Sequence, residues 1–520
     1  MKNLYLEYAL TRIPRLLGSV DRNKLSNTYG CFDRNFWHYR ITDLCGGIYQ
    51  CGVLPLAIVY KHKLPGNQFY NQTRIKELVY AGIKYTSKIL NKEGCADEYY
   101  PYERAYGTTA FLLYAFTESM ILFEENIFNS LFEKMAQWLI KNEDSGKIAN
   151  HLAVSAMALL NVSILTKKEI YHKESQKRIK EMLALQSEEG WFLEYHGFDA
   201  GYLTLSINFL AKYYQKTNDK NLIPTLSKAI EFSSYFIHPD GSYGGEYGSR
   251  GTYHFFPDGF EICGQFNPLS TQISDLYLQG LQNKKNLFND DDRGMHHVVY
   301  DYLQAYLNFN EKRKGEIIRK DFEKYFSQAK IYISKKEDYY LITSINKGGV
   351  FKLFHKEKLV FSDAGLIAKE KSILMSQIVN NNQVHFNDSI KIKGNFSTIS
   401  NPILDTKKFI VFRILLITLF QSKTLSKLLK KILTKKLILR NNKSPLQFTR
   451  ELKLTKKGLE IKDFIKGKIK LKKLYIGTDH TGIYVASSRY YQESILKEWI
   501  ELYVGKFNKQ GNLKFERVLK

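Results

Sequence analysis

The chain has 520 residues, of which 44% are hydrophobic, and its 77 Lys and Arg outnumber its 52 Asp and Glu to give a net charge of +25. This length predicts roughly two to four domains, and the charge favours an anionic partner such as an acidic polysaccharide, an anionic membrane or nucleic acid. The five cysteines form no CxxC pair, which argues against a disulfide framework and fits a reducing compartment.

The N-terminal stretch MKNLYLEYALTRIPRLLGS does not resemble a secretory signal, because Glu7 and Arg12 interrupt its apolar run and no clear cleavage site follows. No run in the sequence reaches the roughly 18–20 apolar residues that span a bilayer. We therefore expect a cytoplasmic chain without a transmembrane helix, peripheral at most at the inner face of a membrane. Residues 1 to about 60 are predicted to be a helical lead-in segment.

Helical periodicity dominates the sequence from about residue 68 to residue 310. Short polar or glycine-containing breaks separate the predicted helices, which span residues 69–91, 103–122, 125–142, 148–165, 167–187, 200–216, 221–237, 265–282 and 294–309. Such successive helical hairpins predict an α/α toroid, an incomplete barrel with its cleft at one rim, over residues 1–320. A helical solenoid is the alternative. Two long glycine-rich loops favour the toroid, because a simple array does not need them.

Beyond about residue 327, short β-branched and aromatic segments with Gly and Asp breaks predict strands. Examples are AKIYISKKEDYYLITSI and FTRELKLTKKGLEIKDFI. We predict an antiparallel β-sandwich over residues 321–520, with the Lys-rich link at 310–326 as the boundary. The predicted fold class is therefore α+β and multidomain, with an N-terminal α/α toroid followed by a C-terminal antiparallel β-sandwich.

One segment, residues 407–450, interrupts the strand pattern and carries twelve basic residues and no acidic one, about half of the +25 excess. Its run FIVFRILLITLF contains Arg413 and is too short to span a membrane. A basic amphipathic helical insertion on an anionic membrane surface is the functional interpretation. The alternative is an insertion that packs on the toroid with solvated lysines. A nucleic-acid partner is not expected, because no recognised motif accompanies the charge.

Residues 189–260 contain two glycine-rich loops that are dense in aromatic and ionisable side chains and are separated by two helical runs. Glycine allows close backbone approach, and function concentrates on loops held by a rigid scaffold. We interpret both loops as walls of one active-site cleft. The predicted catalytic residues are Tyr202, His254, His196, Asn150 and Arg250, and the predicted substrate-binding residues are His151, Tyr195, Asp199, Glu246, Tyr253 and Arg104.

Plain structural roles compete with these assignments. Asn150 could serve only as the N-cap of its helix, and Tyr202 could be a core aromatic. The sequence has no GxSxG, HExxH or P-loop motif, and we expect neither a cofactor nor a metal. A hydrolase remains open, with its two carboxylates drawn from Asp199, Glu194, Glu246 and Asp258.

The residue types present suit β-elimination on a uronic acid better than hydrolysis. Removal of the C5 proton requires that the adjacent carboxylate be neutralised, for which Asn, His or Arg would serve. It also requires a base, and an acid for the leaving oxygen. A tyrosine beside Arg or His can have its pKa lowered enough to take part.

Four segments together resemble the heparinase II/III-like proteins: ERAYGTTAFLLYAFTE, ANHLAVSAMALL, GWFLEYHGFDAGYLTLSINFLAKYY and DGSYGGEYGSRGTYHFFPDGFE. The resemblance covers roughly residues 95–400. It implies an α/α toroid lyase with a C-terminal β-sandwich, acting on a uronate-containing polysaccharide. It also implies that Tyr202 of the glycine-tyrosine step is the base or acid, that Asn150 lies on the asparagine-bearing inner helix, and that His254 supplies the histidine.

Two features depart from the family's secreted degraders, namely the expected lack of an export signal and the basic insertion. Both would suit work at the inner face of a membrane, near surface-polysaccharide assembly. Two other functions stay open. A glycoside hydrolase would release reducing ends without a double bond and would lose activity on Glu246→Gln or Asp199→Asn. A non-catalytic polysaccharide-binding or assembly protein would tolerate Tyr202→Phe.

Overall fold

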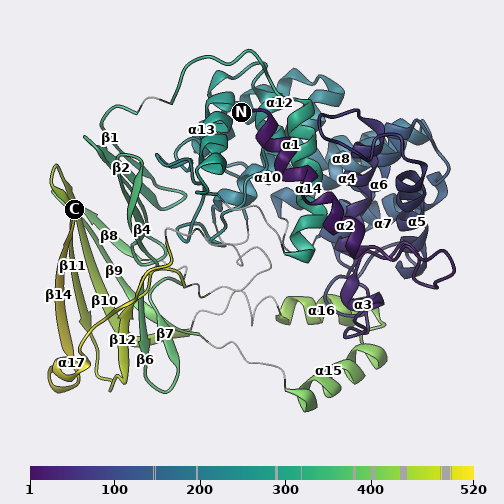
Figure 1. The fold of residues 1–520 in the computed structure, drawn as a ribbon. Coiled ribbons are helices and arrows are strands. Elements are labelled where there is room, and N and C mark those ends of the chain that lie inside the picture. Colours follow the sequence, from purple (N-terminus) through teal and green to yellow (C-terminus); the bar gives the residue numbers. More distant parts are fainter. Residues whose placement is uncertain are drawn as a thin grey trace.

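The computed structural model describes residues 1–144, 146, 148–194, 197–286, 291–317, 319–378, 382–399, 405–433, 442–480, 482, 492 and 495–520. Helices form the first three fifths of the chain and antiparallel strands form most of the rest (Figure 1). The predicted fold class is confirmed: a helical toroid lies beside a C-terminal pair of antiparallel sheets.

Each of the nine predicted helical spans overlaps an observed helix. The helices of this part are α1 (Asn3–Leu10), α2 (Ile13–Ser19), α3 (Arg34–Trp37), α4 (Val53–Lys61), α5 (Thr73–Ile89), α6 (Tyr106–Phe123), α7 (Asn129–Lys141), α8 (Ala149–Thr166), α9 (Glu169–Leu183), α10 (Ala200–Thr217), α11 (Ile223–Ser233), α12 (Asp258–Cys263), α13 (Pro268–Gln282) and α14 (Asp292–Leu307). Short 3-10 helices occupy Gly47–Gly52 and Lys220–Leu222.

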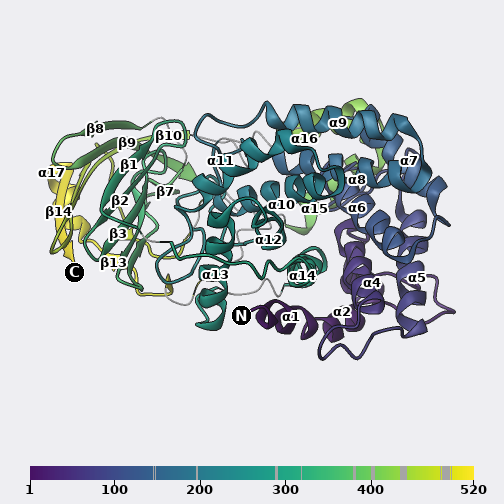
Figure 2. The same ribbon diagram turned by 90° about the horizontal axis from the view of Figure 1, so that it is seen from above.

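The sequence distinguishes inner from outer helices. Helices α6 and α8 are apolar on nearly every face and almost wholly buried, whereas α5 and α9 bury only one face. The ring closes where α1 packs against α14, and the Tyr5 hydroxyl donates to Glu261 on α12 at 2.9 Å. Viewed from above, these helices surround a common centre (Figure 2).

By length and apolar composition alone, α8 could cross a membrane, contrary to the expectation that no such stretch exists. Its most apolar window is 72% buried inside the protein, which is how a core helix of a toroid behaves. The apolar character of α8 is therefore explained by its inner position.

The strands that the structure describes form two antiparallel sheets. Sheet 1 contains, in order, β1 (Phe322–Phe326), β2 (Ile331–Lys336), β3 (Tyr339–Ser344), β4 (Val350–His355) and β5 (Lys358–Asp363). Sheet 2 contains β13 (Ile500–Glu501), β12 (Lys473–Ile476), β6 (Leu366–Lys369), β7 (Ile373–Met375), β9 (Ile390–Ile399), β10 (Asn442–Thr455), β11 (Gly458–Lys466) and β14 (Asn512–Leu519), with β8 (Gln383–Phe386) paired to β9 and a short α17 (Val504–Gln510) before β14.

Sheet 1 is covered on both faces. Along β3, Leu341 belongs to the core shared with sheet 2, while its neighbours Tyr340 and Ile342 belong to the helical core. Every residue of β3 is therefore buried, whereas β11 of sheet 2 alternates between buried and exposed positions. The two-sided burial fixes sheet 1 between the toroid and sheet 2, as Figures 1 and 2 show.

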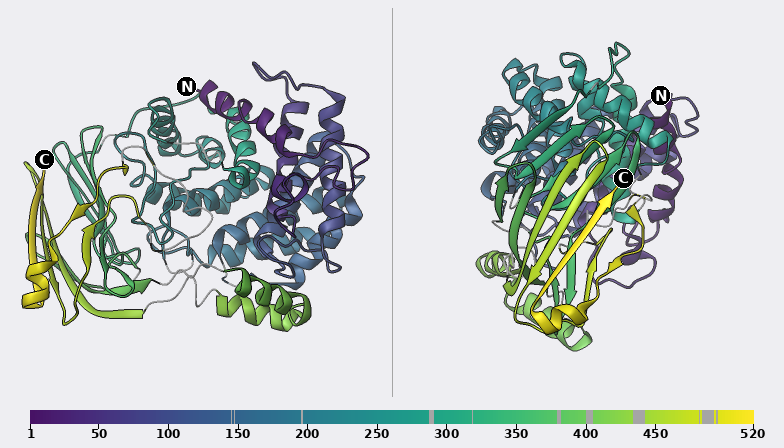
Figure 3. Two further views of the ribbon diagram at one scale, coloured as in Figure 1. Left: turned by 60° about the horizontal axis from the view of Figure 1, so that its bottom comes forward. Right: turned by 90° about the vertical axis from the view of Figure 1, so that its left-hand side faces the viewer.

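The predicted insertion at 407–450 is correct only in its first part. Two helices, α15 (Thr406–Thr418) and α16 (Lys423–Leu433), form a hairpin beneath the toroid (Figure 3), but Asn442–Thr455 is strand β10 at the centre of sheet 2. Arg450 is fully buried there and binds Asp463 through Nε at 2.7 Å and Asp363 through Nη1 at 2.9 Å. Its charge therefore serves the sandwich core and is not available to an external partner.

Candidate active site

The inner helices begin at one end of the toroid, which we call the N-terminal rim. Gly107 on α6 lies directly under the ring of His151 on α8, so that a Cβ there would come within 2.6 Å of His151 Nε2. Phe111 on α6 contacts both His151 and His297 of α14. Because the first two turns of α6, α8 and α14 meet here, the partial positive charges of their helix ends lie close together. Such a place favours an anionic ligand.

Asn150 is not the N-cap of α8, because the helix begins at Ala149 and Ile148 holds the cap position. Its amide nitrogen donates to both carboxylate oxygens of Glu194 at 2.9 Å, and its backbone N–H donates to the same group at 3.1 Å. The sequence predicts that Asn150 binds a carboxylate of the substrate. In the structure, the chain itself supplies a carboxylate.

Burial raises the pKa of Glu194 to about 7, although the hydrogen bonds from Asn150 oppose this effect. The folded chain therefore holds a proton on Glu194 that the unfolded chain has lost above about pH 4.5, where free glutamate titrates. This group's contribution to stability is fully present below that value and disappears as the pH rises through about 7. As the pH rises from about 5 to about 8, the melting temperature of Glu194→Gln should consequently fall less than that of the unmodified chain.

Melting temperature measured against pH for both proteins tests this expectation. Glu231→Gln, on the exposed face of α11, is the matched control and should follow the unmodified chain. Parallel curves for Glu194→Gln and the unmodified chain would show that Glu194 titrates like a solvated glutamate.

Asp199 connects the two glycine-rich loops through hydrogen bonds. It caps α10 by accepting from Tyr202 N at 3.3 Å, and its other carboxylate oxygen accepts from Arg250 N at 2.9 Å. The hydroxyl of Thr252 also donates to Asp199 and accepts from Gly201 N at 3.0 Å. The second loop is thus held against the start of α10 through a carboxylate that is only 1% exposed. Asp199 therefore organises the backbone and has little surface with which to bind substrate.

Tyr202 and His254 form an edge-to-face pair, with ring centroids 5.1 Å apart and an angle of 83° between the planes. Both side chains are partly exposed, whereas Asn150, Asp199 and Arg250 are buried. Burial lowers the pKa of His254 to about 3, so its imidazole is neutral at physiological pH. Tyr202 and His254 therefore present a phenol and a neutral imidazole at the N-terminal rim.

This pair depends on the glycine that precedes Tyr202. A Cβ on Gly201 would come within 2.7 Å of His254 Nε2 and would also press on the Thr252 hydroxyl. Gly201→Ala should therefore displace His254 from the Tyr202 ring and lower the activity of the site by at least tenfold, while the chain still folds. The measurement is catalytic rate together with melting temperature.

Gly197→Ala is the matched control, because among the described residues a Cβ there comes within 4 Å of Ser249 Cβ alone, at 3.9 Å. Its rate should match that of the unmodified chain. Equal rates for Gly201→Ala and Gly197→Ala would exclude a role for the placement of His254.

Glu246 and Tyr253 are joined to each other and covered by the sheet half of the chain. The Tyr253 hydroxyl donates to Glu246, and Lys352 of β4 lies 4.7 Å from the centre of the Tyr253 ring. Lys352 Nζ also donates to Gly244 O at 3.2 Å, and Lys347 Nζ, from the β3–β4 turn, donates to Gly248 O at 2.9 Å. Burial lowers the pKa of both lysines to about 8. Sheet 1 thus clamps the second glycine-rich loop with two buried lysines.

The remaining predicted residues divide between the N-terminal rim and the hairpin. His151 is partly exposed at the rim, and its Nδ1 pairs with Asp144 at 3.0 Å. Arg104 is directed elsewhere, because its guanidinium donates to the carbonyl of Gln421 at 2.7 Å and to that of Phe420 at 3.4 Å, in the α15–α16 turn. In the structure its guanidinium therefore contacts the insertion, and its role in substrate binding stays a prediction. Tyr195 and His196 lie outside the described residues.

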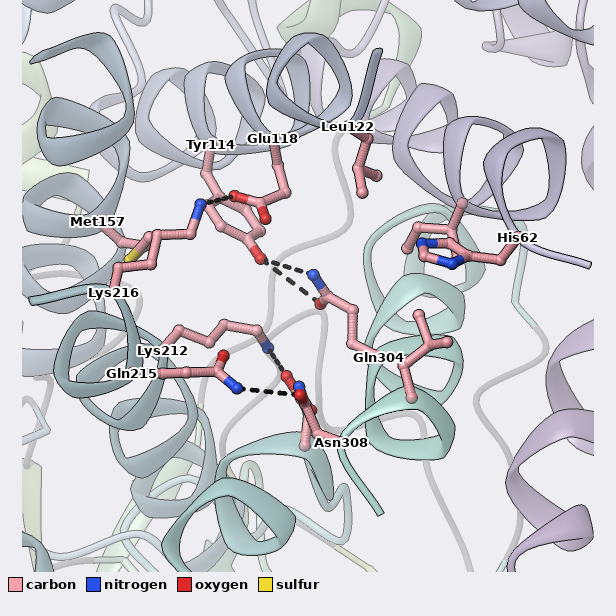
Figure 4. A pocket seen from close by; sticks show the side chains of 13 residues that line it. His62, Tyr114, Glu118, Leu122, Met157, Lys212, Gln215, Lys216, Gln304 and Asn308 are labelled. Carbon is pink, nitrogen blue, oxygen red and sulfur yellow. Dashed lines mark hydrogen bonds and ion pairs between the residues drawn. The ribbon is translucent and has the colours of Figure 1, made fainter. Parts of the chain in front are cut away.

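The opposite end of the toroid contains a cavity of about 180 Å³, lined by the C-terminal halves of α6, α10 and α14 (Figure 4). Lys212 pairs there with Asp258 and Asp301, both at 2.9 Å, and Lys216 pairs with Glu118 at 2.7 Å. Asp258 therefore lies at the wrong end of the toroid to act with Glu194, Asp199 or Glu246. Because the polar groups that line this cavity bind one another, we interpret it as a gap in the packing of the helices and not as a second site.

Within the residues that the structure describes, His, Cys, Asp and Glu side chains form no group of three that could hold a metal ion. All five cysteines are buried as free thiols.

No protein-family model matches the chain, and no curated protein matches it in sequence. Among solved structures, it is similar to the chondroitin AC lyase of Streptomyces coelicolor A3 in complex with chondroitin sulphate, with a TM-score of 0.58 and 7% identity over 91% of this chain and 68% of that one. A mutant of the same enzyme gives a TM-score of 0.52 at 7% identity over the same shares. At this identity the likeness shows the fold: an α/α toroid followed by a β domain, as found in a polysaccharide-processing enzyme.

Proposed function

We propose that the chain is a polysaccharide lyase that cleaves a uronate-containing acidic polysaccharide by β-elimination. The observation that carries the proposal is the Tyr202–His254 pair, partly exposed at the end of the toroid where inner helices begin. The net charge of +25 and the helix N-termini favour a polyanion. The fold shared with a chondroitin lyase supports the same class of substrate. We also propose that the chain is related to the heparinase II/III-like proteins.

In the proposed reaction, a base takes the C5 proton of the uronate, and the C5–H electrons form a C4–C5 double bond. The C4–O bond to the leaving sugar then breaks, and its oxygen gains a proton. Tyr202 takes one of these two proton-transfer roles. His254 is neutral and packs edge-to-face against the ring of Tyr202, so we assign it the role of orienting the phenol.

The substrate carboxylate must be neutralised as charge builds up on C5. Arg250 and Asn150 were predicted for this role. Because Glu194 occupies the Asn150 amide, a uronate would have to displace that carboxylate or bind beside it. Protonation of Glu194, whose pKa burial raises to about 7, would weaken its hold on Asn150 near neutral pH. The decisive test is absorbance of the new C4–C5 double bond on a panel of uronate polymers. A complete lack of that signal with every polymer would sink the lyase proposal.

A glycoside hydrolase on the same toroid is the second candidate, and Glu194 favours it. A carboxyl with a pKa of about 7 is suited to protonate a leaving oxygen at neutral pH, once the substrate displaces Glu194 from Asn150 and uncovers a side chain that is now 1% exposed. This reaction would release reducing ends without a double bond, and Glu194→Gln would abolish it. A non-catalytic polysaccharide-binding protein is the third candidate, and it would give neither product.

A further inference from the structure

We propose that the α15–α16 hairpin docks on the surface of an anionic membrane and holds the N-terminal rim of the toroid toward that surface. This inference concerns where the chain acts, so it stands or falls independently of the chemistry proposed above. It rests on the exposure, charge and anchoring of the hairpin.

The hairpin leaves an apolar surface uncovered. Ten of the large hydrophobic side chains that are exposed in the described structure fall between residues 409 and 432. Six of them have at least half of their surface exposed: Ile410, Val411, Ile414, Ile417, Leu419 and Leu428. Single exposed apolar residues are ordinary, but ten of them on one helical hairpin mark a surface that is covered in use.

The charge of the hairpin points to the partner. From Thr406 to Leu433 the sequence has seven basic residues and no acidic one. Lys407, Lys408 and Lys427 are exposed beside the apolar side chains. Helices that combine aliphatic side chains with lysines lie in the boundary between acyl chains and headgroups, and anionic lipids strengthen that binding.

The hairpin is fixed to the toroid by its other side. Ser426 Oγ donates to Tyr102 O at 2.7 Å, and Arg413 Nη2 binds Asp43 at 2.8 Å. The ring of Phe412 meets that of Tyr100 with centroids 5.9 Å apart. Together with the Arg104 contacts to the α15–α16 turn, these interactions use the inward side chains and leave the apolar ones outward. The patch is therefore not a face that has simply failed to pack.

The anchoring points lie beside the N-terminal rim. Tyr102 and Arg104 immediately precede α6, whose Gly107 supports His151 at the rim. Figures 1 and 3 place both hairpin helices beneath the ring. A membrane that covered the outward face of the hairpin would therefore lie on the side of the toroid where Tyr202 and His254 are partly exposed.

The same features argue against other occupants. A second copy of the hairpin would bring like charges together, and no acidic residue between 406 and 433 could compensate them. Nucleic acid would be bound by the lysines but would leave the aliphatic side chains in water. An anionic bilayer can bind the lysines through its headgroups and can accept the aliphatic side chains among its acyl chains. It therefore matches both features of the hairpin.

The test is co-sedimentation of the full chain with vesicles of phosphatidylcholine alone or mixed with phosphatidylserine. We expect binding to the mixed vesicles that is at least tenfold tighter than to phosphatidylcholine alone and that weakens with salt. The double variant Ile414→Asp, Ile417→Asp should lose at least tenfold of this binding, and Lys407→Glu with Lys427→Glu should remove the preference for phosphatidylserine.

Ile127→Asp with Ile170→Asp is the matched control, because those side chains are 61% and 60% exposed elsewhere on the toroid. It should bind as the unmodified chain does, and equal melting temperatures would show that all variants are folded. Absence of binding to the mixed vesicles would overturn the proposal. So would a concentration-dependent dimer that the Ile414→Asp, Ile417→Asp variant abolishes, because the patch would then cover a second copy.

Discussion

Replacing Tyr202 with phenylalanine is expected to lower the rate of double-bond formation on a uronate polymer by roughly 10²–10⁴-fold, the range typical of a lost proton-transfer group. The substitution removes only the hydroxyl, so the edge-to-face contact with His254 should survive. Asp199 caps α10 through the backbone N–H of residue 202, and this contact is also unaffected. The loss should therefore fall on kcat, with the melting temperature unchanged.

Tyr214→Phe is the matched control for this experiment. Tyr214 lies on the same helix, is also partly exposed and packs against Phe266, but it is near the opposite end of the toroid. Its variant should retain the full rate. If Tyr202→Phe also retains the full rate on a polymer that the chain cleaves, Tyr202 is not the proton-transfer residue, and the site must be sought among the other rim side chains.

Arg450→Met should destabilise the β half by roughly 3–5 kcal/mol, the cost of leaving buried charges without their partner. Arg450 is fully buried between Asp363 and Asp463, which are buried as well. Burial alone would raise the pKa of Asp363, but the guanidinium groups of Arg450 and Arg517 lower it, so this carboxylate stays charged in the folded state. Chemical denaturation followed by a signal from the sheets would measure the loss.

Lys473→Met provides the comparison, because its 2.8 Å pair with Glu501 is exposed on both sides. Exposed ion pairs contribute little to stability, so this variant should unfold almost like the unmodified chain. Equal effects of the two substitutions would mean that the Arg450 network is hydrated and does not serve as a core.

The fold could be predicted from the sequence because the residue patterns that indicate its helices and strands are local. The 3.6-residue period marks the helices, and the alternation of β10 and β11 marks strands that are half buried. The errors arose where tertiary contacts override the local pattern. The predicted helix at 103–122 starts only at Tyr106, because Tyr102 and Arg104 adopt positive φ values of 63° and 53° and donate their backbone N–H groups to Asp97. The basic run placed Arg450 in the insertion, although its buried partners are Asp463 on the neighbouring strand and Asp363, 87 residues earlier in the chain.

The candidate site was accessible in part for the same reason. Loops rich in glycine and ionisable side chains led to Tyr202 and His254, which the structure brings together. Sequence alone could not show that Glu194 would occupy Asn150, or that Asp258 would lie at the opposite end of the toroid. Lys347 and Lys352 carried no signal, because about a hundred residues separate each lysine from the loop that it holds.

The two-sided burial of sheet 1 has a consequence for how the chain could have been assembled in evolution. A toroid that ended before Phe322 would lack the lysines that hold its second glycine-rich loop, and it would leave Tyr235 and Phe232 without the strand residues that pack on them. A sandwich that began there would face water with Ile331, Ile333 and Ile342. Neither half is therefore an interchangeable module, and the two are expected to be inherited together.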